Sequence, residues 1–408
     1  MDTMNLSAPV IAIAVVLISA YIYPALVHYN VYHRITTWYA KRNEQFYVRE
    51  FAESDESILK KVTQFSLKWW TENDIFQLER RAIFSKTWHF VAHASRFRKP
   101  GDYRTYEIAG FSFILILGKD QKVRAFHNIC RHRAYTITKK ESGSSTVLGC
   151  RYHGWSYNTK GELVKAPEFD KVEGFQKEMN SLWEIRSVVK ESMVFVNLDA
   201  GPEVSDLELA AQLKARNTAG VGWISSWKFD AVLNWKLAAG EFSLGRLQNS
   251  QNNWQWMLGG SAKTKEMKLS YSASIWTPHG LLLTVRLLPQ SPSATTIECD
   301  LHAKITHSAK FSSLQKQLKE EIQSEIGRLE IKQRDLSRGH DDFAVAPQEQ
   351  ISRLLRAHLE SERQVGHEIE PAARKQGFSV EGKADDDLCA ELESNLGCKA
   401  NKNGLLDW

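Results

Sequence analysis

Cysteine is scarce in this sequence, and neither sign of charge dominates it. The 408 residues include 5 cysteines at irregular spacings: Cys130, Cys150, Cys299, Cys389 and Cys398. These are too few for the disulfide framework of a small secreted domain, which favours a reducing compartment where thiols are free to bind metal. Lysine and arginine number 53 against 48 acidic residues, so the net charge of +5 gives no reason to expect a nucleic-acid partner.

Histidine is also unevenly distributed, with none between His153 and His279. That gap limits the metal sites that the second half of the chain can form. At 43% hydrophobic and 25% charged residues, the composition is that of a globular protein. The length allows two domains of ordinary size, each with its own core.

Residues 1–33 are predicted to be a membrane anchor. No side chain from Asn5 to Tyr32 is formally charged, and APVIAIAVVLISAYIYPALVH is long enough to cross a hydrocarbon layer of roughly 30 Å as a helix. A cleaved signal peptide would begin with positive charge, whereas the only early charge is Asp2. Basic residues from Arg34 onward place the globular part in the cytoplasm. We therefore expect a single-pass protein of the endoplasmic reticulum membrane.

Changes in residue pattern divide the rest of the chain into four segments. Residues 34–100 combine charged and apolar residues at helical spacing and are expected to be a helical arm leading into the first domain. Residues 101–200 contain short alternating strands, including a hairpin that turns at Gly118–Gln121. Residues 201–370 include a long amphipathic helix over 311–336 that should pack on its own sheet, and residues 371–408 are expected to be a loose tail. The predicted fold class is α+β.

Two short motifs each combine a cysteine with a histidine. Cys130 and His132 lie in HNICRHRAY, Cys150 and His153 lie in LGCRYHGWSY, and 17 residues separate the two pairs. Four such ligands suit a tetrahedral zinc ion or a Rieske [2Fe-2S] cluster. Their setting in loops between short strands favours the cluster. In that arrangement Cys130 and Cys150 hold the inner iron, and His132 and His153 hold the outer iron.

Together with the preceding WHFVAHASRFRKPGDYRTYEIAG, these motifs resemble the Rieske non-haem iron oxygenases, in particular the choline monooxygenase-like enzymes of fungi. The resemblance runs from about residue 69 to residue 289. It implies an all-β Rieske domain followed by a helix-grip catalytic domain. It also implies that a flavin reductase supplies electrons, which pass through the cluster to a mononuclear iron where O2 is activated.

The second half departs from the family pattern. Asn234-Trp235-Lys236 matches the motif that begins the family's iron-binding helix, but the positions of a bridging acid and two histidines hold Leu244, Gln248 and Asn253. Side-chain amides bind iron(II) too weakly to replace two imidazoles. A shifted alignment does not help, because the whole stretch lacks histidine. The sequence therefore predicts a degenerate mononuclear iron site and identifies no catalytic residue.

Other polar residues give weaker signals. Three histidines of the second half are expected to be exposed or satisfied within the core: His279, His302 and His307. Three acids near the expected pocket receive no role: Glu241, Glu298 and Asp300. Three arginines beside the cluster motifs would either guide an acidic reductase or remain solvated loop charges: Arg131, Arg133 and Arg151.

Two functional hypotheses follow from this sequence. One is a membrane-anchored Rieske oxidoreductase of metabolism, including secondary metabolism, that acts on an apolar small molecule and receives electrons from a flavin reductase or another donor. The other is a non-catalytic Rieske electron carrier or scaffold that lacks mononuclear iron. Either could form a homo-oligomer. Retention of all four cluster ligands favours the first hypothesis, and the missing iron ligands favour the second.

Overall fold

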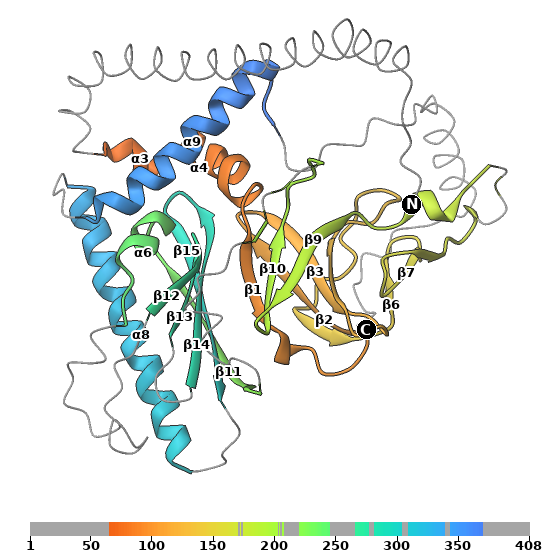
Figure 1. The fold of residues 1–408 in the computed structure, drawn as a ribbon, viewed down its shortest axis with the longest axis horizontal. Helices are drawn as coiled ribbons and strands as arrows, with labels where there is room; N and C mark the ends of the chain where they lie inside the picture. Colours follow the sequence, from red (N-terminus) through yellow and green to blue (C-terminus); the bar gives the residue numbers. More distant parts are fainter. Residues whose placement is uncertain are drawn as a thin grey trace, which may run out of the picture. The chain divides into compact units, whose positions relative to one another are not determined.

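The computed structural model describes residues 65–369 except for 170–171, 173, 203, 205, 208–219, 245–265, 277–280, 304–308 and 339–342. From Leu67 onward these residues belong to one compact unit (Figure 1). The predicted anchor over 1–33 and the predicted tail over 371–408 lie outside the described residues. Within the described ranges, no helix combines the length and the apolar character needed to cross a bilayer.

Short helices precede the first sheet. They are α3 (Leu67–Thr71), α4 (Asn73–Glu79) and the π-helical turn η2 (Arg80–Phe84). Their apolar side chains Phe76, Ile83 and Phe84 are buried in the main core. The C-terminal helix α9 (Val345–Val365) is tied to η2 by an ion pair of 2.7 Å between Arg81 and Glu362. The first and last helices of the described chain therefore close over the same core.

Ten antiparallel strands form the first β region. Seven of them make one sheet in the order β1-β10-β9-β4-β3-β2-β5, and β6-β7-β8 make a smaller sheet. The strands are β1 (His89–His93), β2 (Asp102–Ile108), β3 (Phe111–Leu117), β4 (Val123–His127), β5 (Ser142–Ser144), β6 (Val147–Gly149), β7 (Ser156–Asn158), β8 (Leu163–Lys165), β9 (Glu184–Lys190) and β10 (Met193–Asn197). The short helices η3 (Ala94–Arg96) and η5 (Lys177–Asn180) lie in connections.

The predicted hairpin at Gly118–Gln121 is confirmed. It joins β3 to β4, and the Gln121 N–H donates to the Gly118 carbonyl over 3.0 Å. Gln121 adopts a left-handed conformation with φ +60°, as tight hairpin turns require.

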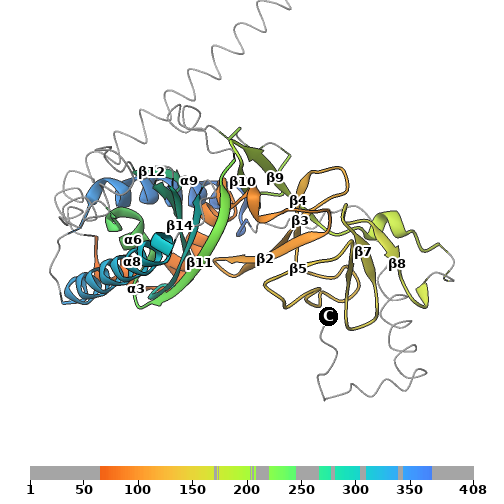
Figure 2. The same cartoon turned by 90° about the horizontal axis from the view of Figure 1, so that it is seen from below.

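A five-stranded antiparallel sheet in the order β11-β15-β14-β13-β12 organises the second half. Its strands are β11 (Gly222–Ala231), β12 (Glu266–Ser270), β13 (Ala273–Trp276), β14 (Leu281–Ser291) and β15 (Ala294–Ala303), accompanied by α6 (Trp235–Glu241) and α8 (Ala309–Leu336). Together with the first β region this bears out the α+β class. In Figures 1 and 2, α8 runs along one side of this sheet, while β1 and β10 lie on the other side.

The long helix was predicted correctly, including the surface against which it packs. Leu318, Ile322, Ile326 and Leu329 of α8 share a buried apolar cluster with alternate residues of β14 and β15. The helix therefore lies on its own sheet. The side chains of Phe311 and Leu314, also predicted on this stripe, lie outside the described set.

The opposite face of the sheet carries a buried polar network that reaches β1. Arg286 of β14 donates to the carboxylate of Asp300 over 2.8 Å and to the backbone carbonyl of Val91. Arg96 of η3 donates to the Ser226 hydroxyl over 3.1 Å and lies 3.9 Å from Asp300. These contacts fasten the two β regions to each other through groups that are removed from water.

Candidate functional site

The two cysteine motifs form loops with the same backbone pattern. In the first loop the Cys130 N–H donates to the Tyr135 carbonyl over 2.8 Å, and the Ala134 N–H donates to the Cys130 carbonyl over 3.0 Å. In the second loop the Cys150 N–H donates to the Trp155 carbonyl over 2.7 Å, and the Gly154 N–H donates to the Cys150 carbonyl over 3.0 Å. The fifth residue of each loop is left-handed, with φ +53° at Ala134 and φ +73° at Gly154.

Strand pairing fixes both loops at equivalent positions. An isolated bridge pairs Ile129 with Thr136 around the first loop, and the β6–β7 ladder pairs Gly149 with Ser156 around the second. In each loop the paired residues directly precede the cysteine and follow the last loop residue. The local sequences differ, with histidine two residues after Cys130 and three residues after Cys150. The loops are therefore two copies of one supporting turn, each presenting one thiol and one imidazole.

The two thiols meet in a buried environment. Cys130 and Cys150 are 2% and 3% exposed, and the Tyr157 hydroxyl lies 3.2 Å from the Cys130 sulfur. A hydrogen bond with the Cys150 thiol lowers the pKa of Cys130 to about 6, helped by Tyr157 and by backbone N–H groups of the loop. The same thiol–thiol hydrogen bond, together with burial, raises the pKa of Cys150. The N–H groups of both loops point toward sulfur, an arrangement that stabilises negative charge there.

The two imidazoles also meet. The ring centroids of His132 and His153 are 4.5 Å apart, and both rings are half-buried. His132 stacks on Trp155 at 4.9 Å with an angle of 10° between the planes, and the edge of Phe169 completes its surroundings. The structure thus brings all four predicted ligands together as a thiol pair and an imidazole pair.

This grouping by type fits a binuclear cluster. A Rieske [2Fe-2S] cluster has its two thiolates on one iron and its two imidazoles on the other, whereas zinc requires four ligands around one point. The wall of the site also contains a buried indole N–H, that of Trp155, with no hydrogen-bond partner. The residues present therefore fit a cluster that offers sulfur acceptors.

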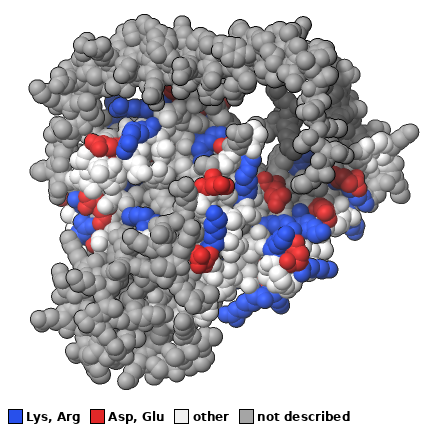
Figure 3. Space-filling model, in the orientation of Figure 1, with Lys and Arg blue, Asp and Glu red and all other residues white. Residues whose placement is uncertain are grey.

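The three arginines near the motifs have different environments. The guanidinium of Arg131 stacks on Trp183 at 4.1 Å, and partial burial lowers its pKa. Arg133 and Arg151 are exposed. Arg131 is therefore part of the support of the first loop rather than a freely solvated charge. On the face shown in Figure 3, basic and acidic side chains lie side by side across the described surface.

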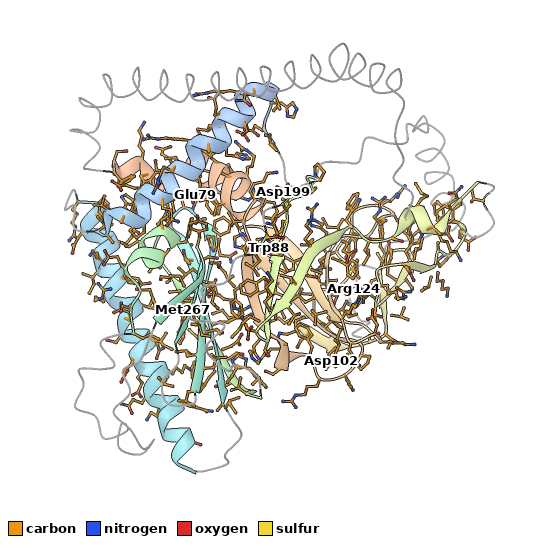
Figure 4. All side chains as sticks on the ribbon, in the orientation of Figure 1. Glu79, Trp88, Asp102, Arg124, Asp199 and Met267 are labelled. Atoms are coloured by element: carbon orange, nitrogen blue, oxygen red, sulfur yellow. The ribbon has the colours of Figure 1, made fainter. Side chains whose placement is uncertain are left out.

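In the second half, the motif Asn234-Trp235-Lys236 has a structural explanation. The Asn234 side chain caps α6 by accepting from the Lys236 N–H over 2.9 Å. The Trp235 indole donates to Glu79 over 2.6 Å, and the Lys236 ammonium pairs with the same carboxylate, with both charged groups buried. Glu79, the last residue of α4, is labelled in Figure 4. These contacts fix α6 to α4 without a metal ion.

Of the three positions predicted for the degenerate iron site, Leu244 is described and is 2% exposed. It lies in the apolar cluster between α8 and the sheet. Gln248 and Asn253 lie outside the described residues, as do His279 and His307.

His302 is fully buried, and neither of its two ring nitrogens has a hydrogen-bond partner. Its ring lies 4.8 Å from that of His93. Of the two environments predicted for His302, the structure therefore shows the core rather than the surface. No local pattern in the chain indicates this contact, because the partner comes from β1 in the other β region.

The three acids that received no role take part in structural contacts. Glu241 accepts from the Ala344 N–H over 2.6 Å and from Lys332 over 3.0 Å. Glu298 and Asp300 both pair with Arg286, over 3.2 Å and 2.8 Å. This network was not predictable from the sequence, since its members alternate along ordinary strands and only the sheet topology brings them together.

Comparison with known proteins agrees with this geometry. Residues 87–176 match the family model described as the Rieske [2Fe-2S] domain. The chain is 32% identical to the carnitine monooxygenase oxygenase subunit of Acinetobacter baumannii over 179 residues, which cover 42% of this chain and 48% of that protein. It is 31% identical to the benzene 1,2-dioxygenase subunit alpha of Pseudomonas putida over 181 residues, which cover 42% and 40%. The chain thus spans about half, or less, of the length of these relatives.

Solved structures show the same fold over a longer range. The apo form of a quaternary ammonium Rieske monooxygenase superposes with a TM-score of 0.57 at 23% identity, covering 67% of this chain and 85% of that chain. Naphthalene 1,2-dioxygenase from Rhodococcus gives a TM-score of 0.53 at 17% identity, covering 65% and 79%. Residues 87–176 of this chain therefore form a Rieske [2Fe-2S] domain, and its homologues are Rieske non-haem iron oxygenases, namely carnitine monooxygenase oxygenase subunits and ring-hydroxylating dioxygenase alpha subunits.

Proposed function

We propose that the protein is an oxidoreductase that transfers single electrons through a [2Fe-2S] cluster held by Cys130, Cys150, His132 and His153. The observation that carries this proposal is the pair of equivalent loops, which bring thiol to thiol and imidazole to imidazole. When bound, the cluster supplies a one-electron couple whose potential is raised by its histidine ligands.

The chain's own residues would set the properties of that couple. Backbone N–H groups and the Tyr157 hydroxyl direct hydrogen bonds at the cysteine sulfurs, and such bonds favour the more negative, reduced state. Leu148, Trp155 and Phe169 form an apolar wall behind the loops. This wall keeps water away from the thiol side, while the half-buried imidazoles lie nearer the surface, where an electron can enter or leave.

We further propose that the whole protein is an oxygenase-type enzyme of metabolism, anchored in the membrane through residues 1–33 with its globular part in the cytoplasm. The uncharged segment from Asn5 to Tyr32 supports the anchor. The relatives named as oxygenase and dioxygenase subunits support the reaction class. A flavin reductase or a similar donor would supply the electrons, and an apolar small molecule would be the substrate. Deletion of residues 1–33 should release a cluster-containing protein into the soluble fraction, and persistent membrane binding in high salt would refute the single anchor.

The second candidate is an electron carrier or scaffold without mononuclear iron. It is favoured by Leu244, which occupies a packed apolar core where the family pattern calls for a bridging acid. The buried contacts of Asn234-Trp235-Lys236 also explain why that motif persists in a chain that binds no iron there. In this case the helix-grip region would serve as a binding or assembly module.

One experiment tests the proposal and separates the two candidates. The full-length chain, purified in detergent and reconstituted anaerobically, is assayed for iron and sulfide and examined by electron paramagnetic resonance after reduction. A Rieske-type spectrum with about two irons per chain supports the carrier, and about three irons supports the oxygenase. A reconstituted protein with no Rieske-type spectrum would reject electron transfer through this site altogether.

A further inference from the structure

Trp155 joins the two loops of the candidate site. It follows the turn of the second loop, and its ring lies almost parallel to the imidazole of His132 from the first loop, with 4.9 Å between the centroids and 10° between the planes. The backbone of Trp155 is fixed by the bond from its carbonyl to the Cys150 N–H, over 2.7 Å. The position of the indole is therefore set by one cysteine, and its ring contacts a ligand on the other loop.

Aromatic neighbours hold the indole in a single orientation. Phe169 meets Trp155 edge-on at 5.3 Å and His132 at 5.1 Å, and Phe175 meets Trp155 at 5.6 Å. Trp155 is only 2% exposed. Surrounded on these sides, the ring cannot turn its N–H toward water without displacing the phenylalanines.

The indole N–H of Trp155 is nevertheless without a hydrogen-bond partner. Buried tryptophan N–H groups normally find an acceptor. The fully buried Trp235 follows this rule by donating to Glu79 over 2.6 Å, and the half-buried Trp69 and Trp223 donate to Gln348 and Ser226 over 3.0 and 2.9 Å. The Trp155 donor differs in this respect from these three described tryptophans, and it lies in the wall of the site that fits a cluster.

We propose that Trp155 is a positioning residue for the cluster, with two separable effects. Its N–H donates a hydrogen bond to a sulfur of the cluster, and its ring fixes the plane of His132. This inference rests on the proposed function and adds a residue outside the four ligands. A hydrogen bond to a cluster sulfur is stronger when the cluster is reduced and more negative, so Trp155 raises the reduction potential.

Two substitutions separate these effects in the full-length, cluster-loaded protein. Trp155→Phe keeps an aromatic surface against His132 but removes the N–H, and Trp155→Leu removes both. Potentials are measured by redox titration followed by electron paramagnetic resonance. We expect Trp155→Phe to retain the Rieske-type spectrum. Its equilibrium constant for reduction should fall about tenfold, which corresponds to a potential lower by 59 mV for a one-electron couple. Trp155→Leu should lower the potential at least as much and also shift the spectrum, because His132 loses its stacking partner.

Two further variants calibrate the measurement. Tyr157→Phe removes a hydroxyl that lies 3.2 Å from the Cys130 sulfur and should lower the potential in the same direction. Trp69→Phe removes an indole N–H that donates to Gln348 over 3.0 Å, away from the two loops, and it should leave the potential unchanged.

The outcomes distinguish this inference from the proposed function. A Trp155→Phe potential equal to that of the unmodified protein would overturn the hydrogen bond, provided that Tyr157→Phe shifts it. If the Trp155 variants fail to hold a cluster, the unmodified protein can be grown with 15N-indole tryptophan and examined by electron–nuclear double resonance. Coupling of an indole nitrogen to the reduced cluster is expected, and its absence would overturn the inference. Failure of the unmodified protein to show a Rieske-type spectrum would instead reject the proposed function.

Discussion

The buried ion pair between Lys236 and Glu79 offers a direct test of why Asn234-Trp235-Lys236 is present in this chain. The two side chains are 1% and 0% exposed, and the Lys236 ammonium also lies 4.5 Å from the ring centroid of Trp69. Burial lowers the pKa of Lys236, and the attraction of Glu79 opposes this effect. Lys236→Met would remove the cation and leave Glu79 in the core without its counter-charge.

Breaking a buried pair in this way costs about 3–5 kcal/mol, because the remaining charge is neither solvated nor paired. The compact unit from Leu67 onward is larger than a typical domain, so each kcal/mol lowers its melting temperature by only roughly 1.5 °C, and a decrease of about 5–8 °C is expected. Thermal unfolding followed by circular dichroism measures this shift. The exposed pair of Lys316 and Glu320, at 3.9 Å, supplies a matched control, and Lys316→Met should change the stability by less than about 0.5 kcal/mol.

A double variant distinguishes a buried charge from a packing defect. Glu79→Gln combined with Lys236→Met removes both charges, while the amide oxygen introduced at this position still accepts from the Trp235 indole, and the pair of changes should recover most of the lost stability. The Rieske-type spectrum of the folded single variant should be unchanged, since the motif holds α6 rather than the cluster. If Lys236→Met were nearly neutral, or if the double variant were as unstable as the single one, the structural explanation of the motif would be wrong.

Three further predictions concern the ligands, the second metal and pH. Replacing His132 or His153 by alanine should abolish the Rieske-type spectrum, because each is one of only two imidazoles on the outer iron, and an unchanged spectrum in either variant would remove the assignment. For a degenerate mononuclear site, as the carrier requires, Gln248→Ala and Asn253→Ala should leave iron at about two per chain, whereas loss of a third iron would show that amides act as ligands and would favour the oxygenase. Burial, and then the neighbouring His93, lower the pKa of His302 to about 3 in the folded state, while the unfolded value is near 6.5. Urea unfolding should therefore show stability falling by up to about 1.4 kcal/mol per unit as pH drops from 6.5 toward 3, and His302→Leu should flatten that dependence.

Local signals predicted those parts of the structure that depend on neighbouring residues. The apolar stripe of Leu318, Ile322 and Ile326 was enough to predict α8. Residues at this spacing lie on one face of a helix, and that face packs on the sheet. The turn residues Gly118–Gln121 were enough to predict the hairpin between β3 and β4. The meeting of the four cysteine and histidine side chains could be anticipated, because cysteine and histidine are chemically specific and each pair lies within a single loop.

Contacts between distant segments were not predictable in this way. Glu79 and Lys236 are 157 positions apart, and each resembles an ordinary charged surface residue in its own segment. His302 meets His93 only because β15 and β1 belong to sheets that pack together. Helix α9 was missed as well. Its apolar residues Ile351 and Leu355 enter the core of the first β region, which the local pattern around them does not reveal.

That shared core decides whether the first half of the chain could fold without the second half. The cluster of buried residues around β1, β3 and β4 contains Trp235 from α6 and Leu355 from α9, and Arg286 reaches Val91 from the other sheet. A fragment ending near residue 200 would lose these side chains and expose the surface that they cover. The first β region would therefore not fold as a free-standing module. The second half of the chain is thus a structural requirement of the first β region, whichever of the two proposed functions the protein has.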